Sequence, residues 1–196
     1  MKRTAIQILL LINLLVGGFG CSTSTLKRRI QEPIRTDYSV NDPEFSRSIS
    51  HLLNPPLIGG NHVVELLNGD RIFSSMLEAI RHAQKSITFE TYIWSPGKVS
   101  DQFVEAFIER ARAGVKINVI VDALGSRNFS TADRKQLTDA GVKFEIYNPP
   151  FFLKILRANH RTHRKQMVVD GRIGFTGGVC IDDEWAGNAE PGQWRD

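Results

Sequence analysis

The stretch NHRTHRKQMVVDGRIGFTGG, residues 159–178, decides how this chain is interpreted. Within it His163, Lys165 and Asp170 follow the order H-x-K-x-x-x-x-D. In an extended chain, side chains two positions apart project from the same face, so His163 and Lys165 are expected to point together. Such a pair suits a phosphate, because the ammonium holds the oxygens while a neutral imidazole nitrogen attacks phosphorus. The spacing therefore predicts a phosphoryl-transfer site.

The second half of the stretch predicts a β-hairpin. Residues 166–169 are mostly apolar, residues 170–172 (Asp-Gly-Arg) signal a turn, and residues 173–176 resume a strand. The pair Gly177 and Gly178 follows this strand. Because glycine has no Cβ, the backbone there is able to approach a phosphate closely. We therefore expect the two glycines to form a phosphate loop.

The stretch allows two other interpretations. One is a basic, solvated hairpin, although a chance H-x-K-x-x-x-x-D match in a chain of this size has odds on the order of one per cent. The other is a zinc site built on His160 and His163, which lie three positions apart. No cysteine or third histidine stands nearby at ligand spacing, so no metal is expected.

The stretch resembles the HKD motif of the phospholipase D superfamily, with His163, Lys165 and Asp170 at the motif positions. The similarity covers about residues 58–196 and is strongest to the bacterial cardiolipin synthase-like branch. One position departs, since Cys180 stands where many members carry Asn; we expect it to be a buried, inert thiol without a disulfide partner. The segments that add to the resemblance are Asn68-Gly69-Asp70, residues 89–93, residues 114–116 and Gly187-Asn188.

The resemblance implies transfer of a phosphatidyl group through a phosphohistidine, with no cofactor and no metal. His163 is the expected nucleophile and Lys165 the cation on the phosphoryl oxygens, while Asp170 orients and supports. A general acid protonates the leaving alcohol. The implied substrate is a phospholipid, phosphatidylglycerol or a similar lipid, and the acceptor is water or another glycerol-bearing lipid.

The superfamily needs two such motifs facing each other, and this sequence holds one. We expect the chain to be the first half of a two-motif enzyme, apparently truncated, with a second HKD half in cis. The alternatives are a single-motif homodimeric nuclease and a non-catalytic, membrane-tethered fragment that binds phosphate. The net charge of +4 does not choose between lipid and nucleic acid. The export leader expected at residues 1–20 favours a lipid substrate, so nucleic acid is the less expected partner.

The N-terminal residues resemble an export leader. Residues 1–20 combine a basic start with an apolar run, from residue 6 to 16, that is short for a membrane span. Cys21 follows as in a bacterial lipoprotein processing site, where the cysteine is lipidated. An exported, membrane-associated lipoprotein is expected, with an uncleaved anchor or plain secretion as alternatives. Residues 21–57 are polar and proline-punctuated, a linker with one short helix within 42–53.

From residue 58 onward, strands alternate with helices, and this predicts an α/β domain with a parallel or mixed sheet. The resemblance makes it a phospholipase D-like mixed sheet flanked by helices, which we expect on both faces. Strands are predicted at residues 62–67, 86–94, 115–121 and 142–147, and helices around residues 72–83, 103–111 and 130–140.

Two carboxylates, Glu90 and Asp122, lie near the ends of predicted strands. Ligand clefts in α/β sheets open at this edge. A buried carboxylate is costly unless it is paired, so each is expected either in the site or beside a basic partner. We therefore include both as possible site carboxylates.

Overall fold

The computed structural model describes residues 38–53, 57–149 and 160–196, and the chain divides into two units, residues 1–61 and 62–196. The described residues of the first unit form α2 (Pro43–Leu52), which has a proline in its first turn. This is the short helix predicted within residues 42–53. The leader and Cys21 lie outside the described residues, so the predictions made there stay predictions. None of the helices in the described ranges is long and apolar enough to cross a membrane.

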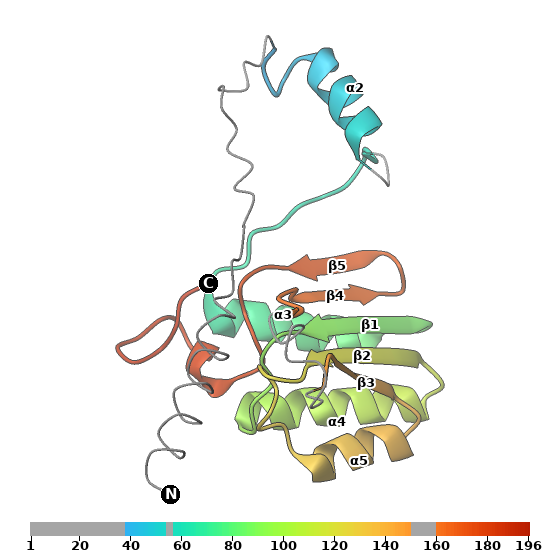
Figure 1. Cartoon of the computed structure of the whole chain (residues 1–196), viewed down its shortest axis with the longest axis vertical. Coiled ribbons are helices and arrows are strands. Elements are labelled where there is room, and N and C mark those ends of the chain that lie inside the picture. Colours follow the sequence, from blue (N-terminus) through green and yellow to red (C-terminus); the bar gives the residue numbers. More distant parts are fainter. Residues whose placement is uncertain (1–37, 54–56, 150–159) are drawn as a thin grey trace, which may run out of the picture. The chain divides into compact units, whose positions relative to one another are not determined.

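The second unit is built on a five-stranded mixed sheet with the order β3-β2-β1-β4-β5 (Figure 1). The first three strands are parallel, β4 runs antiparallel to β1, and β5 antiparallel to β4. The mixed sheet and the C-terminal hairpin are therefore confirmed. The strands are β1 (Ser86–Thr91), β2 (Lys116–Asp122), β3 (Lys143–Tyr147), β4 (Gln166–Val169) and β5 (Ile173–Thr176), and the helices are α3 (Asn68–His82), α4 (Lys98–Arg112), α5 (Thr131–Asp139) and the short 3-10 helix η2 (Asp183–Trp185).

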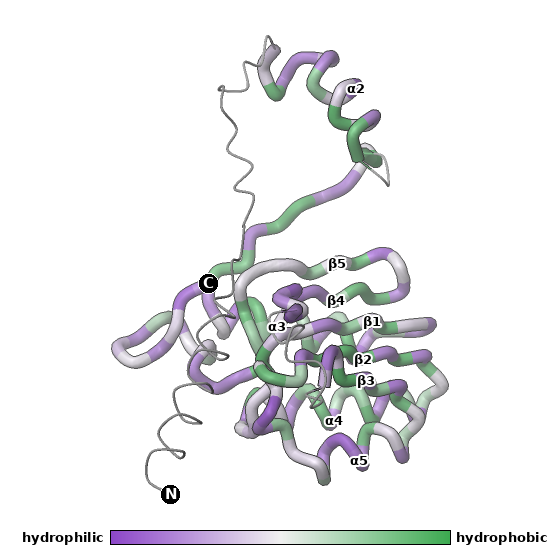
Figure 2. Tube along the Cα trace, viewed as in Figure 1, coloured by the Kyte–Doolittle hydropathy of each residue, from purple (hydrophilic) through white to green (hydrophobic). Residues whose placement is uncertain are grey.

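The helices form where the sequence places apolar residues on one face. α3 buries Ile72, Met76, Leu77 and Ile80, and α4 buries an aromatic pair, Phe103 and Phe107. α5 is mostly hydrophilic (Figure 2) and buries Leu137. It begins at a capping serine, Ser130, whose hydroxyl accepts the backbone N–H of Asp133 at 3.2 Å, as the sequence predicted.

The described helices cover one face of the sheet, which corrects the expectation of two covered faces. Ile87, Phe89 and Val119 point into the core, while Thr88 and Asn118, one position along, are exposed. The connections from β1 through α4 to β2, and from β2 through α5 to β3, run in the same direction across the sheet. Right-handed crossovers in one direction place their helices on the same face.

Residues 62–67 are not the predicted strand. They form no regular secondary structure, no described strand pairs with them, and Val63 is 88% exposed. Their apolar pattern resembles a strand, yet a strand forms only where a neighbour accepts its hydrogen bonds. The strand predicted at 86–94 is also shorter, since β1 ends at Thr91 and Trp94 makes only an isolated bridge to Ile181.

Candidate active site

The side chains of His163 and Lys165 lie next to each other near the C-terminal end of β1, just before β4 begins. Nζ of Lys165 lies 3.2 Å from Nδ1 and 3.3 Å from Nε2 of His163, and it donates to the His163 carbonyl oxygen at 3.1 Å. The imidazole is exposed and the lysine half-buried. The expected common orientation is therefore confirmed. A nitrogen lone pair of the neutral imidazole is the nucleophile that phosphoryl transfer requires, and the ammonium beside it is placed to hold the phosphoryl oxygens.

Tyr92 is a third member of this cluster, to which sequence reasoning gave no role. Its ring centroid lies 4.7 Å from that of His163, with 52° between the planes. The ammonium of Lys165 lies 5.6 Å from the Tyr92 ring centroid, within the range of a cation–π contact. The signal available in the sequence was its place two positions after Glu90, in the last part of the strand predicted at residues 86–94.

Glu90 is buried on the opposite side of the segment that carries His163. The hydroxyl of Thr162 donates to its Oε1, and Nε2 of Gln166 donates to its Oε2 at 2.9 Å. A nitrogen of Arg164 lies 3.9 Å from the same Oε2. Positions 162, 164 and 166 thus face Glu90, so alternation sends the intervening His163 and Lys165 to the other side.

Asp122 is completely buried and fully engaged. Its Oδ1 accepts the backbone N–H groups of Leu124 at 2.8 Å and Gly125 at 3.1 Å, and its Oδ2 accepts that of Thr162 at 3.1 Å. A nitrogen of Arg161 lies 3.6 Å from Oδ1. Each of the two predicted carboxylates therefore has the basic partner that burial demands. The described contacts join them to the supports of His163 and not to its ring.

Asp170 lies at the far end of β4 from His163 and Lys165. Its carboxylate accepts the backbone N–H groups of Gln84 at 2.9 Å, Lys85 at 2.7 Å and Ser86 at 2.9 Å. These bonds, that of Ser86 foremost, hold the pKa of Asp170 below its ordinary value. The structure brings His163 and Lys165 together but ties Asp170 to the start of β1, a supporting position.

The glycine pair forms a backbone cradle that already holds an anion. The carboxylate of Asp196 accepts the N–H groups of Gly178 at 3.1 Å and Val179 at 3.0 Å. It lies so close to Gly178 that a Cβ on that residue would overlap it, and it also approaches Gly177. The carbonyl oxygen of Asp196 accepts the N–H of Asn68 at 3.0 Å. The loop has the close approach expected of it, with a carboxylate as the group it binds.

Cys180 is a buried free thiol, as predicted, and it lies within electrostatic reach of the site. Burial raises the pKa of the Cys180 thiol, while a backbone hydrogen bond at Ile93, the charge of Lys165 and the Thr91 side chain act in the opposite direction. The position where many members of the superfamily carry Asn thus holds a buried thiol in this chain.

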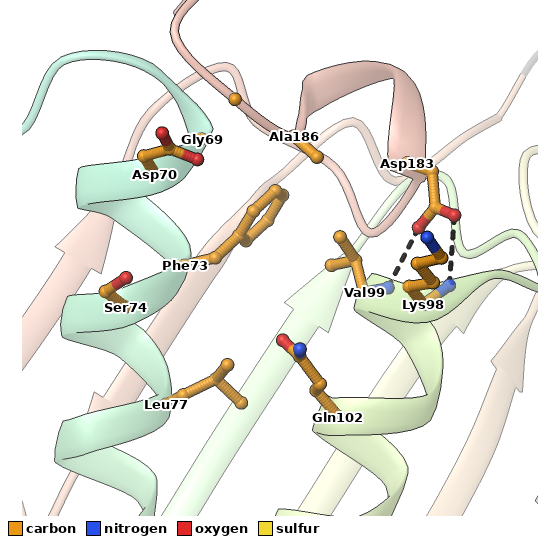
Figure 3. A pocket seen from close by; sticks show the side chains of 11 residues that line it. Gly69, Asp70, Phe73, Ser74, Leu77, Lys98, Val99, Gln102, Asp183 and Ala186 are labelled. Atoms are coloured by element: carbon orange, nitrogen blue, oxygen red, sulfur yellow. Dashed lines mark hydrogen bonds between the residues drawn. The ribbon is translucent and has the colours of Figure 1, made fainter.

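The described residues of this unit line, among others, the following two pockets. One of about 820 Å³ includes Lys165, both cradle glycines and Asp196, beside an apolar wall that contains Phe89, Met167, Phe175 and Val179. The other, about 500 Å³, lies between the first turns of α3 and α4 (Figure 3). There Asp183 caps α4 by accepting the N–H groups of Lys98 at 3.0 Å and Val99 at 2.8 Å, which is a structural role. Of these two pockets, the larger is the one whose lining includes Lys165 of the HKD motif.

The described residues contain no group of three or more His, Cys, Asp or Glu side chains arranged to hold a metal ion. A zinc site on His160 and His163 would need further ligands at tetrahedral positions.

Comparison with known proteins places the chain in a family. The family described as "Cardiolipin synthase, PLD-like domain" matches residues 76–190. The chain is 32% identical to cardiolipin synthase 1 of Bacillus anthracis over 179 residues, which is 87% of this chain and 35% of that protein. It is 40% identical to cardiolipin synthase B of Salmonella typhi over 127 residues, 64% of this chain and 31% of that protein. The chain thus spans about a third of the length of these curated relatives.

Among solved structures, the chain is similar to the phospholipase D family member Nuc from Salmonella typhimurium, with 19% identity and a TM-score of 0.43 over 57% of this chain and 65% of that one. The resemblance drawn from the HKD motif is confirmed by the family match and by the relatives. The chain belongs to the cardiolipin synthase-like family of the phospholipase D superfamily.

Proposed function

We propose that this chain contributes one half of the active site of a phosphatidyltransferase that acts on phospholipids, through a covalent intermediate on His163. The observation that supports this most directly is the contact between Lys165 and the exposed ring of His163, at 3.2 Å. The names of the relatives, cardiolipin synthases, supply the substrate class.

In the proposed reaction a ring nitrogen of His163 attacks the phosphorus of phosphatidylglycerol. An N–P bond forms, the P–O bond to the leaving glycerol breaks, and a general acid gives that glycerol its proton. A hydroxyl of a second glycerol-bearing lipid then attacks phosphorus and gives its proton to the same group, and the N–P bond breaks. Lys165 stabilises the charge on the non-bridging oxygens during both steps.

The general acid is proposed to come from a second HKD half, in cis or from a second copy of the chain. The sequence holds one H-x-K-x-x-x-x-D, and the chain spans 35% of the Bacillus anthracis relative. Since one histidine cannot be attached to phosphorus and protonate the leaving group at once, a second group is required. A homodimeric nuclease and a non-catalytic phosphate-binding fragment are the alternatives that the same motif permits.

Lipidation at Cys21 is the proposed route to the membrane. A basic start, a short apolar run and a cysteine followed by small polar residues lie in series at the N-terminus.

The deciding experiment traps the adduct. The chain, alone and as a covalently linked tandem of two copies, is mixed with phosphatidylglycerol vesicles or with DNA and quenched at high pH, where phosphohistidine survives. Peptide mass spectrometry is expected to find a phosphatidyl group on His163 in the lipid sample. His82→Asn, at an exposed histidine on α3, serves as the matched control for His163→Asn. An adduct that persists in His163→Asn, or one formed with DNA alone, would overturn the proposal.

A further inference from the structure

We infer that Tyr92 is a positioning residue of this site, whose ring fixes the orientation of His163 and Lys165. The buried carboxylate of Asp122 in turn holds the two backbone segments that carry Tyr92 and His163. The inference rests on the proposed function only for the reaction that His163 performs. The arrangement itself stands on the contacts of Tyr92, Gly125, Thr162 and Asp122.

The Tyr92 ring limits how the two functional side chains can turn. His163 is exposed, so without a neighbour its ring would sample several rotamers. The tilted contact at 4.7 Å between ring centroids restrains the imidazole, and the ammonium of Lys165 lies over the same tyrosine ring at 5.6 Å. One aromatic ring thus contacts both the imidazole and the ammonium. Holding reacting groups in a near-attack geometry lowers the activation free energy by more than the energy of such a contact.

The backbone of Tyr92 is held by the loop after β2. Its carbonyl oxygen accepts the hydroxyl of the buried Ser126 at 3.0 Å. Gly125 packs so closely on that carbonyl that a Cβ at position 125 would overlap it. Glycine is therefore required at position 125 for close approach, and the loop acts as a rigid support for the strand end that carries Tyr92.

Asp122 joins this support to the segment that carries His163. One carboxylate oxygen accepts N–H groups of the loop, from Leu124 and Gly125, and the other accepts the N–H of Thr162, the residue before His163. Thr162 lies 40 positions from Asp122 in the sequence, so this bond is a tertiary link. Because the side chain of Asp122 is completely buried, its position is fixed by the core. The spacing of Tyr92 and His163 is thus set by one carboxylate.

The chemistry of this link explains why a carboxylate is needed. Both oxygens act as acceptors toward backbone donors, and an amide offers only one oxygen. In Asp122→Asn, the side-chain NH₂ group would face the backbone N–H groups either of the loop or of Thr162. Donor would then meet donor, and a hydrogen bond would be lost. Arg161, 3.6 Å from Oδ1, would also lose its counter-charge. The expected result is a displaced Tyr92 loop or a displaced His163 segment.

The inference is tested by NMR of the full chain, without substrate. His163→Asn assigns the His163 ring signals, and the parent protein is expected to show nuclear Overhauser effects between the rings of Tyr92 and His163. Tyr92→Leu should abolish these effects and shift the His163 signals, and Tyr92→Phe should restore both. Tyr147→Leu, at an exposed tyrosine of β3, is the matched control and should leave the signals in place. Parent protein without the ring-to-ring effects would overturn the inference, whatever the variants do.

A second measurement separates positioning from folding. In an active two-motif form, kcat of Tyr92→Leu is expected to fall about tenfold or more, while KM stays within about twofold. Equal kcat in the parent and Tyr92→Leu would contradict the inference. The NMR result needs no turnover, so an inactive two-motif form with intact ring contacts would reject the proposed function and leave the contact of Tyr92 with His163 and Lys165 established.

Discussion

The carboxylate of Asp170 accepts the backbone N–H of Lys85 at 2.7 Å, across 85 positions of sequence and at the far end of β4 from His163. The HKD motif thus has two parts in space. His163 and Lys165 form the reactive end, and Asp170 fastens the turn of the hairpin to the start of β1.

Asp170→Asn is expected to lower stability at neutral pH, because the amide oxygen replaces only part of a carboxylate that accepts three N–H groups. The pKa of Asp170 is lowered in the folded state, so its stabilising effect is present above the ordinary carboxylate range. It is lost as pH falls through the folded-state pKa. Urea midpoints of the parent and the variant should therefore differ at neutral pH and converge in acid. Asp139→Asn, an exposed carboxylate paired with Lys135, is the control and should change little.

His163→Ala is expected to reduce phosphatidyl transfer by about 10³-fold or more in the complete enzyme, because the covalent route is abolished. Lys165→Ala should also be severe, since the phosphoryl oxygens lose their nearest cation. Initial rates on phosphatidylglycerol vesicles measure both. Lys143→Ala, at an exposed lysine of β3, is the control. Full activity in His163→Ala would show that another nucleophile operates.

Chelation is expected to leave the activity unchanged, because the proposed steps use only protein groups. The same vesicle assay with and without EDTA, followed by zinc addition, measures this. Reversible loss of activity on chelation would reopen the zinc interpretation built on His160 and His163.

Thr162→Val is expected to destabilise the fold by about 1–3 kcal/mol, since an acceptor of the buried Glu90 loses its hydroxyl donor. Thr162→Ser should recover most of the loss, because serine restores that donor. Equilibrium urea unfolding measures the difference. Thr88→Val, at an exposed threonine of β1, is the control and tests whether a threonine-to-valine change by itself lowers the free energy of unfolding. A Thr162→Val variant as stable as the parent would show that Gln166 and Arg164 satisfy Glu90 without it.

Cys21→Ala is expected to abolish incorporation of labelled palmitate in bacteria and to release the chain from the membrane fraction. Cys180→Ala is the matched control, because the thiol at position 180 is buried and should not be acylated. Equal labelling of the parent and Cys21→Ala would remove the lipoprotein proposal.

Features with local causes could be predicted from the sequence. The apolar periodicity of α3, the cap at Ser130 and the turn at residues 170–172 each depend on neighbours in sequence, and all three occur in the structure. The pairing of His163 with Lys165 also follows from local alternation along the chain. These elements required no knowledge of distant contacts.

Other features depend on contacts that the sequence does not display. Residues 62–67 have the pattern of a strand but lack a paired neighbour among the described strands. The roles of Tyr92 and Asp122 depend on which loops meet at the end of the sheet, and the bond of Asp196 to Gly178 joins positions 18 apart. Glu90 and Asp122 stand out in the sequence by their place near the ends of predicted strands. The basic partner of each follows from the cost of burying a charge, which is a physical constraint independent of topology.

The backbone N–H groups of Gly178 and Val179 already bind the carboxylate of Asp196, and this lowers their affinity for anions from solution. A carboxylate that belongs to the same chain competes with a free anion at an effective concentration on the order of millimolar or more. Asp196 is held in place at its carbonyl by Asn68, so little freedom is lost when its side chain binds the cradle. An anion from solution that binds these two N–H groups therefore has to displace the tethered carboxylate of Asp196 from them.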